Sequence, residues 1–178
     1  MAKLPAFPST LLFLVPGPRV PKWRRALGPR RRTSGGSFAL HYRLPPVFLC
    51  RVGRAAARTG ARTSLVESSP DGVAAARQNL GGVEVVAARV ETALRKRRIT
   101  GPVHLVVLDP PRSGAGAEVV KAIAAAGPRA VAYVACDPAA LGRDVGTFRR
   151  LGWSMSSIRA FDCFPMTRHV ECVALLTP

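Results

Sequence analysis

Strand-like and helix-like segments alternate along this chain from residue 63 to residue 151. The strand-like segments are short apolar runs at Ser64–Glu67, Val83–Ala88, Val103–Leu108 and Ala130–Ala135. The segments with helical spacing lie at Pro70–Leu80, Val90–Arg98, Ala115–Ala126 and Pro138–Leu151. This alternation predicts an α/β domain with a mostly parallel sheet. Two further strands, near Trp153–Ala160 and His169–Leu176, are expected to join one edge, with an antiparallel strand there.

Residues that begin and end helices support this assignment. Ser69 followed by Pro70 is typical of a helix N-terminus, and Gly81-Gly82 is expected to end that helix. Pro138 can open the last helix in the same way. One face of that helix is apolar and is predicted to point inward; its members are Leu141, Val145, Phe148 and Leu151.

Polar or reactive side chains follow three of the predicted strands at the point where each strand ends. They are Glu67, Asp109 and Cys136. Ligands of parallel sheets bind outside the carboxyl ends of the strands, so we expect a site there. A carboxylate at the end of a second strand, as in Glu67, is suited to bind ribose hydroxyls, although glutamates before helices are also common caps. Asp109-Pro110-Pro111-Arg112 predicts a rigid polar loop, and we favour a functional site there over a simple turn.

The roles of Cys136 and Glu171 are left open by their local sequence. A lone cysteine is most often a small buried hydrophobe, but a position between a strand and a helix N-terminus favours a thiolate nucleophile. Glu171 lies within an apolar run, where it is either a solvent-facing edge residue or a partly buried base with a raised pKa. Residue spacing does not decide between these alternatives.

Charge divides the chain into two parts. Residues 1–62 hold 13 Lys and Arg and no Asp or Glu, whereas residues 63–178 hold 14 Lys and Arg against 10 Asp and Glu. Eight prolines also interrupt residues 1–62, so we predict a basic, irregular segment that is not natively folded, followed by a domain at 63–178. The four cysteines form no CxxC pair, which argues against a metal site and favours a cytoplasmic protein with free thiols. No apolar run reaches transmembrane length.

Three motifs in the second part are similar to a known family in order and spacing. They are Leu108-Asp109-Pro110-Pro111-Arg112-Ser113-Gly114, Tyr133-Val134-Ala135-Cys136-Asp137-Pro138-Ala139-Ala140-Leu141-Gly142-Arg143-Asp144 and Phe161-Asp162-Cys163-Phe164-Pro165-Met166-Thr167-Arg168-His169-Val170-Glu171. Together they resemble the C-terminal part of the catalytic domain of the RNA uracil-5-methyltransferases. The resemblance covers roughly residues 63–178.

This resemblance implies a Rossmann-like class I methyltransferase fold and a reaction. Methyl transfer from S-adenosylmethionine to carbon 5 of a uridine in tRNA or rRNA would use Cys136 as nucleophile and Glu171 as base. Glu67 and Asp109 would contact the cofactor, and the target uridine would leave its RNA stack. The alternative is a non-catalytic, basic RNA-binding protein built on the remnant of such a domain.

One part of the family pattern is missing before residue 63. The glycine-rich turn after the first strand, which forms the main cofactor cradle, has no counterpart around Gly35-Gly36 or Gly53. We therefore expect a partial methyltransferase domain that lacks its first strand-turn. The acid-free composition of residues 1–62 further suggests a segment translated in another frame and joined to a true C-terminal piece.

Overall fold

The structure is a computed structural model, and it describes residues 10–15, 61–99, 101–163, 166 and 170–178. The strands are β1 (Thr10–Val15), β2 (Arg62–Glu67), β3 (Glu84–Ala87), β4 (Leu105–Asp109), β5 (Ala130–Ala135), β6 (Ser154–Phe161) and β7 (Glu171–Thr177). The helices are α2 (Pro70–Asn79), α3 (Val90–Arg95), α4 (Ala117–Ala125) and α5 (Pro138–Arg150). The predicted alternation of strands and helices is confirmed, with ends that differ by a few residues.

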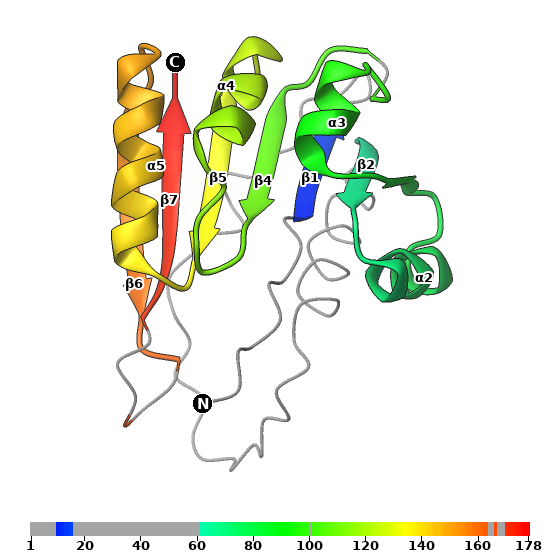
Figure 1. The fold of residues 1–178 in the computed structure, drawn as a ribbon, viewed down its shortest axis with the longest axis horizontal. Helices are drawn as coiled ribbons and strands as arrows, with labels where there is room; N and C mark the ends of the chain where they lie inside the picture. Colours follow the sequence, from blue (N-terminus) through cyan, green and yellow to red (C-terminus); the bar gives the residue numbers. More distant parts are fainter. Residues whose placement is uncertain (1–9, 16–60, 100, 164–165, 167–169) are drawn as a thin grey trace.

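The described strands form one sheet in the order β3-β2-β1-β4-β5-β7-β6 (Figure 1). β2 through β6 run in one direction, and β1 and β7 run antiparallel to their neighbours. The closing pair joins one edge as predicted, with β7 between β5 and β6. The α/β fold with a mostly parallel sheet is therefore confirmed.

A strand from the basic first part occupies the centre of the sheet. β1 pairs antiparallel with both β2 and β4, and Thr10 lies opposite Asp109. Because β1 runs antiparallel, its last residue, Val15, lies at the end of the sheet opposite the carboxyl ends of β2 and β4. Among the described residues, no glycine-rich turn therefore follows a first strand at the carboxyl edge. The remainder of the predicted irregular segment, up to residue 60, lies outside the described residues.

Local capping explains where two of the helices begin. Ser69 is the N-cap of α2 and its hydroxyl accepts a hydrogen bond from the Gly72 N–H, with Pro70 in the first turn, as predicted. α5 begins at Pro138, and the carboxylate of Asp137 accepts from the Ala140 N–H at 2.7 Å. The helix that follows Cys136 therefore starts where the sequence places it.

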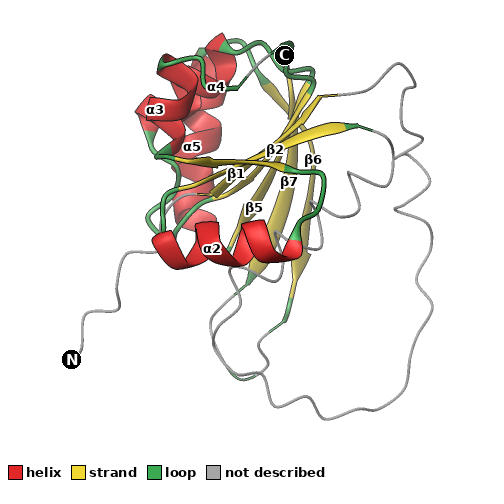
Figure 2. Cartoon of the chain, turned by 90° about the vertical axis from the view of Figure 1, so that its right-hand side faces the viewer, coloured by secondary structure: helices red, strands yellow, loops and turns green. Residues whose placement is uncertain are grey.

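Helices cover the two faces of the sheet unequally (Figure 2). α3, α4 and α5 pack on one face over the larger buried cluster, which includes Val106, Leu108 and Phe148. α2 packs on the other face over a smaller cluster of Leu65, Ala76, Leu80 and Val107. The larger core therefore lies under α3, α4 and α5.

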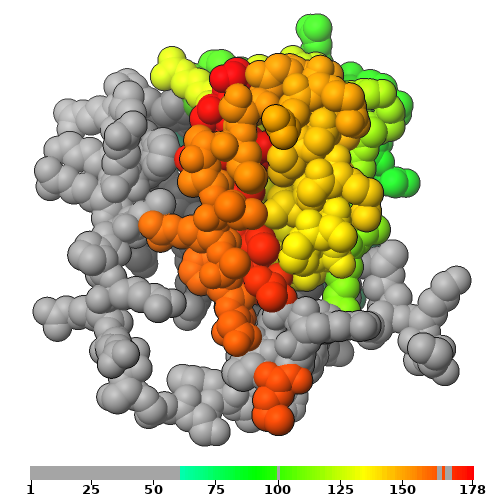
Figure 3. All heavy atoms as spheres, turned by 90° about the vertical axis from the view of Figure 1, so that its left-hand side faces the viewer, coloured from blue at the N-terminus to red at the C-terminus, as the bar shows by residue number. Residues whose placement is uncertain are grey.

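The buried face of α5 differs from the predicted one at its end. Leu141 and Phe148 are buried as expected, but Leu151 is 42% exposed, so its inward placement was wrong. Asp144 and Thr147 are buried on this helix instead. Leu151 follows the last helical residue, and the next strand, β6, is exposed along its length. The orange spheres of this segment lie on the surface in Figure 3. None of the described helices is long and apolar enough to cross a membrane.

Candidate active site

The four residues predicted to form a site all lie at one edge of the sheet. Glu67 and Asp109 are the last residues of β2 and β4, and Cys136 follows the last residue of β5. Glu171 is the first residue of β7, which runs antiparallel and therefore starts at the same edge. The fold thus brings together residues that are more than 100 positions apart in sequence.

Cys136 and Glu171 meet at the end of one strand ladder. Ala135 of β5 is paired with Cys172 of β7, so the next residues along this ladder are Cys136 and Glu171. Directly opposed residues of an antiparallel pair project to the same face. The charge of Glu171 acts on the half-buried thiol and raises its pKa. The thiol and the carboxylate are therefore neighbours across β5 and β7.

The pKa of the Cys136 thiol is raised from its ordinary value, first by burial and then by the negative charge of Glu171. The Arg112 guanidinium and a backbone hydrogen bond act in the opposite direction but are outweighed. The sequence-based expectation that the helix N-terminus favours a thiolate here was therefore wrong for the unliganded chain. Desolvation of a charged sulfur exceeds the stabilisation from the few N–H groups that reach it.

Asp109 is a carboxyl group whose proton is held unusually tightly. Burial, followed by the negative charges of Glu171 and Glu67, raises its pKa to about 6. Its backbone lies opposite Thr10 of β1, which separates β4 from β2. The carboxyl groups of Glu67, Asp109 and Glu171 thus lie along the same end of the sheet, with Asp109 on a strand between the other two.

Glu67 is buried, with 6% of its surface exposed, and lies against the start of α2. Its Oε1 accepts a hydrogen bond from the Ser69 N–H at 2.7 Å. A Cβ at position 72 would lie 2.8 Å from Glu67 Cγ, so Gly72 leaves the room that this side chain needs. The cap-like contact that we considered for Glu67 is present, and a ribose-binding role stays a prediction.

The second part of the chain matches a known family of enzymes. The model of the tRNA (uracil-5-)-methyltransferases matches residues 99–178, which contain Asp109, Cys136 and Glu171. The C-terminal part of this chain is therefore similar to the RNA uracil-5-methyltransferase family. Glu67 lies outside that match.

Similar proteins match a little under two thirds of this chain and are themselves much longer. A Streptomyces avermitilis protein named uncharacterized RNA methyltransferase is 52% identical over 116 residues, which is 64% of this chain and 27% of that protein. A Streptomyces coelicolor protein of the same description is 48% identical over 116 residues, 64% of this chain and 25% of its own length. The chain therefore spans about a quarter of the length of these relatives.

A solved structure has the same fold. It is the Pyrococcus abyssi tRNA (uracil-54, C5)-methyltransferase in complex with S-adenosyl-L-homocysteine. The TM-score is 0.58 at 26% sequence identity, over 73% of this chain and 31% of that chain. This similarity supports a Rossmann-like methyltransferase fold for the described sheet and helices.

A buried polar contact that lies next to the candidate site residues was given no role in the sequence analysis. The hydroxyl of Tyr133 on β5 donates to the carboxylate of Asp144 on α5, and both side chains are buried. Asp144 falls three residues after Leu141 and four before Phe148, so it occupies a position on the inward face of the helix. An acid at such a position was the available sign of a buried polar contact. Among the described residues, no group of three or more His, Cys, Asp or Glu is placed to hold a metal ion.

Proposed function

We propose that residues 63–178 form part of the catalytic domain of an enzyme that methylates carbon 5 of a uridine in tRNA or rRNA. The observation that carries this proposal is the juxtaposition of Cys136 and Glu171 at the end of the β5–β7 ladder, in a segment that matches the uracil-5-methyltransferase family. A thiol and a carboxylate on opposed positions supply the nucleophile and the base that this chemistry requires.

S-adenosylmethionine fits the acceptors at the other side of the site. Glu67 and Asp109 provide carboxylate oxygens at the ends of β2 and β4, where ribose and amino groups of a nucleoside cofactor can donate hydrogen bonds. When bound, the cofactor supplies an electrophilic methyl group. In this proposal Glu67 and Asp109 orient it, and Asp109 is ionised above its pKa of about 6.

The reaction begins at the sulfur of Cys136. Its thiolate adds to carbon 6 of the uracil, and the electrons of the C5–C6 double bond move toward the carbonyl at carbon 4, so that carbon 5 becomes nucleophilic. Carbon 5 then takes the methyl group, the bond between the methyl group and the sulfonium sulfur breaks, and S-adenosylhomocysteine is the leaving group. Glu171 removes the proton from carbon 5, the C5–C6 double bond forms again, and the bond between carbon 6 and sulfur breaks to release the thiolate.

The raised pKa of Cys136 implies that the thiol must lose its proton before attack. The Arg112 guanidinium is the positive group that favours this ionisation, whereas Glu171 opposes it. Binding of RNA would enclose the site and remove water, which strengthens both interactions. Arg112 therefore belongs to the machinery that we propose for the nucleophile.

Trapping with 5-fluorouridine RNA tests the proposal. In this RNA, carbon 5 of the uracil carries fluorine in place of hydrogen, so the last step of the reaction has no proton to remove. In the presence of S-adenosylmethionine the enzyme is therefore expected to remain covalently attached to the RNA. Cys136→Ala should abolish this adduct, which is measured on a denaturing gel. Cys163→Ala is the matched control, because Cys163 is an exposed thiol and should leave the adduct intact. An adduct that persists in Cys136→Ala would refute the assignment of the nucleophile.

The charge of residues 1–62 supports a second candidate, a non-catalytic RNA-binding protein. Thirteen cations without a single acid would attract phosphates regardless of the site. This candidate predicts RNA retention that falls steeply with salt and is unchanged in Cys136→Ala. Filter binding across a salt series, carried out beside the trapping experiment, separates the two functions.

A further inference from the structure

A buried carboxylate joins two loops of the site. Asp144 on α5 is only 5% exposed. Its Oδ2 accepts hydrogen bonds from the Ala115 N–H at 2.6 Å and from the Tyr133 hydroxyl at 2.5 Å, and its Oδ1 accepts from the Gly116 N–H at 3.2 Å. The Ala115 N–H also approaches the Tyr133 oxygen at 3.2 Å. Asp144 thus contacts β5 and the residues just before α4 at once.

This carboxylate binds the two residues that precede α4. Gly116 is the N-cap of α4 and has no side chain to accept a hydrogen bond from the first turn. Asp144, on a different helix, accepts hydrogen bonds from the N–H groups of Ala115 and Gly116 just before the first turn, and its negative charge lies at the favourable end of α4. Gly114 makes the approach possible, since a Cβ there would lie 2.7 Å from Asp144 Oδ2.

The loop from Asp109 to Gly116 is consequently held at both ends. Asp109 is fixed in the β4 ladder, and the other end is bound to Asp144. Between them, the Gly114 N–H donates to the Pro111 carbonyl at 2.8 Å and closes a turn around Arg112. α5 itself starts two residues after Cys136, so Asp144 ties the loop that carries Arg112 to the element that carries the sulfur.

The charged groups that act on Cys136 come from three elements. Arg112 lies in the loop after β4, Asp109 ends β4, and Glu171 begins β7. Arg112 is the cation among them, so its place relative to the sulfur decides how much the two carboxyl groups are offset. A small displacement of the loop would remove this compensation.

We propose that Asp144, together with Tyr133, is a positioning residue that holds the Arg112 loop against Cys136. It acts on the nucleophile only through Arg112 and touches neither substrate nor cofactor. The inference rests on the proposed function for the importance of Cys136, but its structural content does not require methyl transfer.

The test is the pH dependence of Cys136 alkylation in the full chain. Iodoacetamide labelling is followed by mass spectrometry of the peptide that contains Cys136, with exposed Cys163 as the internal reference. Asp144→Asn keeps the shape of the side chain but loses acceptors. We expect Cys136 to react about threefold to tenfold more slowly at pH 7, which is a rise in its pKa of about half a unit to one unit. Arg112→Gln should change the profile in the same direction.

The sign of the change excludes a direct electrostatic effect. Removing a negative charge at position 144 would by itself lower the pKa of a nearby thiol, whereas displacement of Arg112 raises it. The double variant Asp144→Asn/Arg112→Gln should behave like Arg112→Gln alone, because the first change acts through the second residue. Tyr133→Phe, which leaves the charge unchanged, should give a smaller shift in the same direction and decides the question if Asp144→Asn does not fold.

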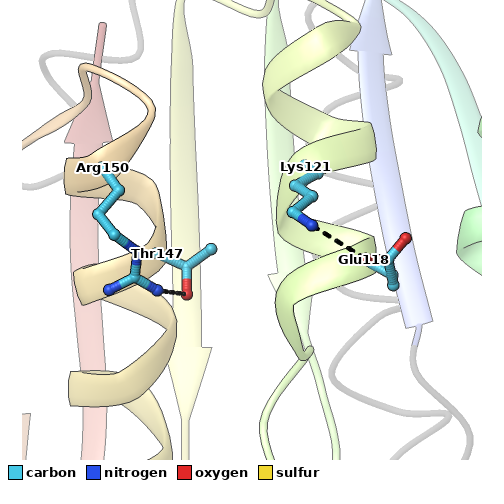
Figure 4. Close-up of polar contacts among 4 residues, drawn as sticks. All are labelled: Glu118, Lys121, Thr147 and Arg150. Carbon is cyan, nitrogen blue, oxygen red and sulfur yellow. Dashed lines mark hydrogen bonds and ion pairs between the residues drawn. The ribbon is translucent and has the colours of Figure 1, made fainter.

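Thr147→Ala is the matched control on the same helix. Thr147 is buried, donates to the Arg143 carbonyl and accepts from Arg150 at 2.9 Å, and these two hydrogen bonds stay within α5 (Figure 4). Lys121→Gln, which removes an exposed ion pair with Glu118 on α4, is a second control. Both should retain the parental alkylation profile.

Three results would overturn the inference: an unchanged or lowered Cys136 pKa in folded Asp144→Asn, additive shifts in the double variant, or an equal shift in Thr147→Ala. Because alkylation needs neither RNA nor S-adenosylmethionine, failure of fluorouridine trapping leaves this test intact. Conversely, trapping with an unchanged alkylation profile in Asp144→Asn would support the proposed function and remove the role of Asp144.

Discussion

The two sides of the carboxyl edge are built in different ways. On the side of β4, β5 and β7, the Arg112 loop is bound to a buried carboxylate and backed by the larger cluster under α4 and α5. On the side of β2, Glu67 accepts a hydrogen bond from the Ser69 N–H and is backed by the smaller cluster under α2. The family match covers the first side and not the second. On the nucleophile side, Asp144 thus joins segments 29 residues apart in sequence, while on the proposed cofactor side the hydrogen bond from Ser69 to Glu67 joins residues two positions apart.

Both sides use a glycine to admit a carboxylate, and the two glycines differ. Gly114 approaches Asp144 and has a φ of +86°, which side chains rarely adopt. Gly72 approaches Glu67 but has no positive φ and lies in the first turn of α2. A substitution at Gly114 therefore meets two obstacles, and one at Gly72 meets a single, flexible neighbour.

The largest expected difference concerns the two clusters. Phe148→Ala removes a fully buried ring that packs against Trp153 at 5.5 Å, and should lower the free energy of unfolding by about 4 kcal/mol. Leu80→Ala in the smaller cluster should cost about 2 kcal/mol, because its site lies at the end of α2 and can relax. Urea denaturation measures both. Equal losses would contradict the contrast between the two sides.

Gly114→Ala should be next in size. The positive φ and the clash with Asp144 together are expected to lower stability by about 3 kcal/mol. Gly116→Ala is the matched control: it has a φ of +82°, but a Cβ there would meet nothing within 4 Å, so it should cost about 1 kcal/mol. Thermal melting of both variants measures the difference, and a smaller loss in Gly114→Ala would argue against a tight fit to Asp144.

Asp109 predicts a pH dependence of stability in the chain without ligands. Its pKa is raised from 3.8 to about 6, so the folded state binds the proton more tightly than the unfolded chain. The stability that it contributes is complete below pH 3.8 and is lost as the pH rises through 6. Asp109→Asn should therefore be more stable than the parent by about 2 kcal/mol at pH 7.5, with no difference near pH 4. Denaturation at both pH values checks the sign.

The smallest expected effect on stability is that of Gly72→Ala. The gain in helix propensity offsets the displacement of Glu67, so the free energy of unfolding should stay within about 1 kcal/mol of the parent. Binding of S-adenosylmethionine, measured by calorimetry, should nevertheless weaken if Glu67 contacts the cofactor. Gly142→Ala in α5, where a Cβ would meet nothing within 4 Å, should raise stability by about 1 kcal/mol and leave binding unchanged. Equal binding by both variants would remove Glu67 from the cofactor site.

Much of the fold could be predicted because its determinants are local. Ser69 and Pro70 form a cap within a few residues, and alternating apolar runs identify strands and helices regardless of the rest of the chain. The same locality placed Glu67, Asp109 and Cys136 at strand ends. The roles of these residues as cofactor contacts and nucleophile remain predictions.

The errors of the sequence-based interpretation share a long-range cause. Leu151 was assigned to the core from helical spacing, but the helix ends before it and its side chain is exposed. The pKa of Cys136 was expected to fall near a helix N-terminus, yet burial and Glu171, which is 35 residues away in sequence, raise it. Spacing along a chain carries no information on how much water a folded neighbour excludes.

The sequence by itself determined the alternation of strands and helices, the residues that begin α2 and the position of the candidate nucleophile at the end of β5. Only the tertiary structure decided that β1 enters the centre of the sheet antiparallel, that Glu171 meets Cys136, and that Asp144 binds the Arg112 loop. The physical reason is the separation along the chain over which each interaction acts. Backbone preferences and caps act over one turn, whereas strand order, desolvation and shared hydrogen bonds arise when distant segments pack together.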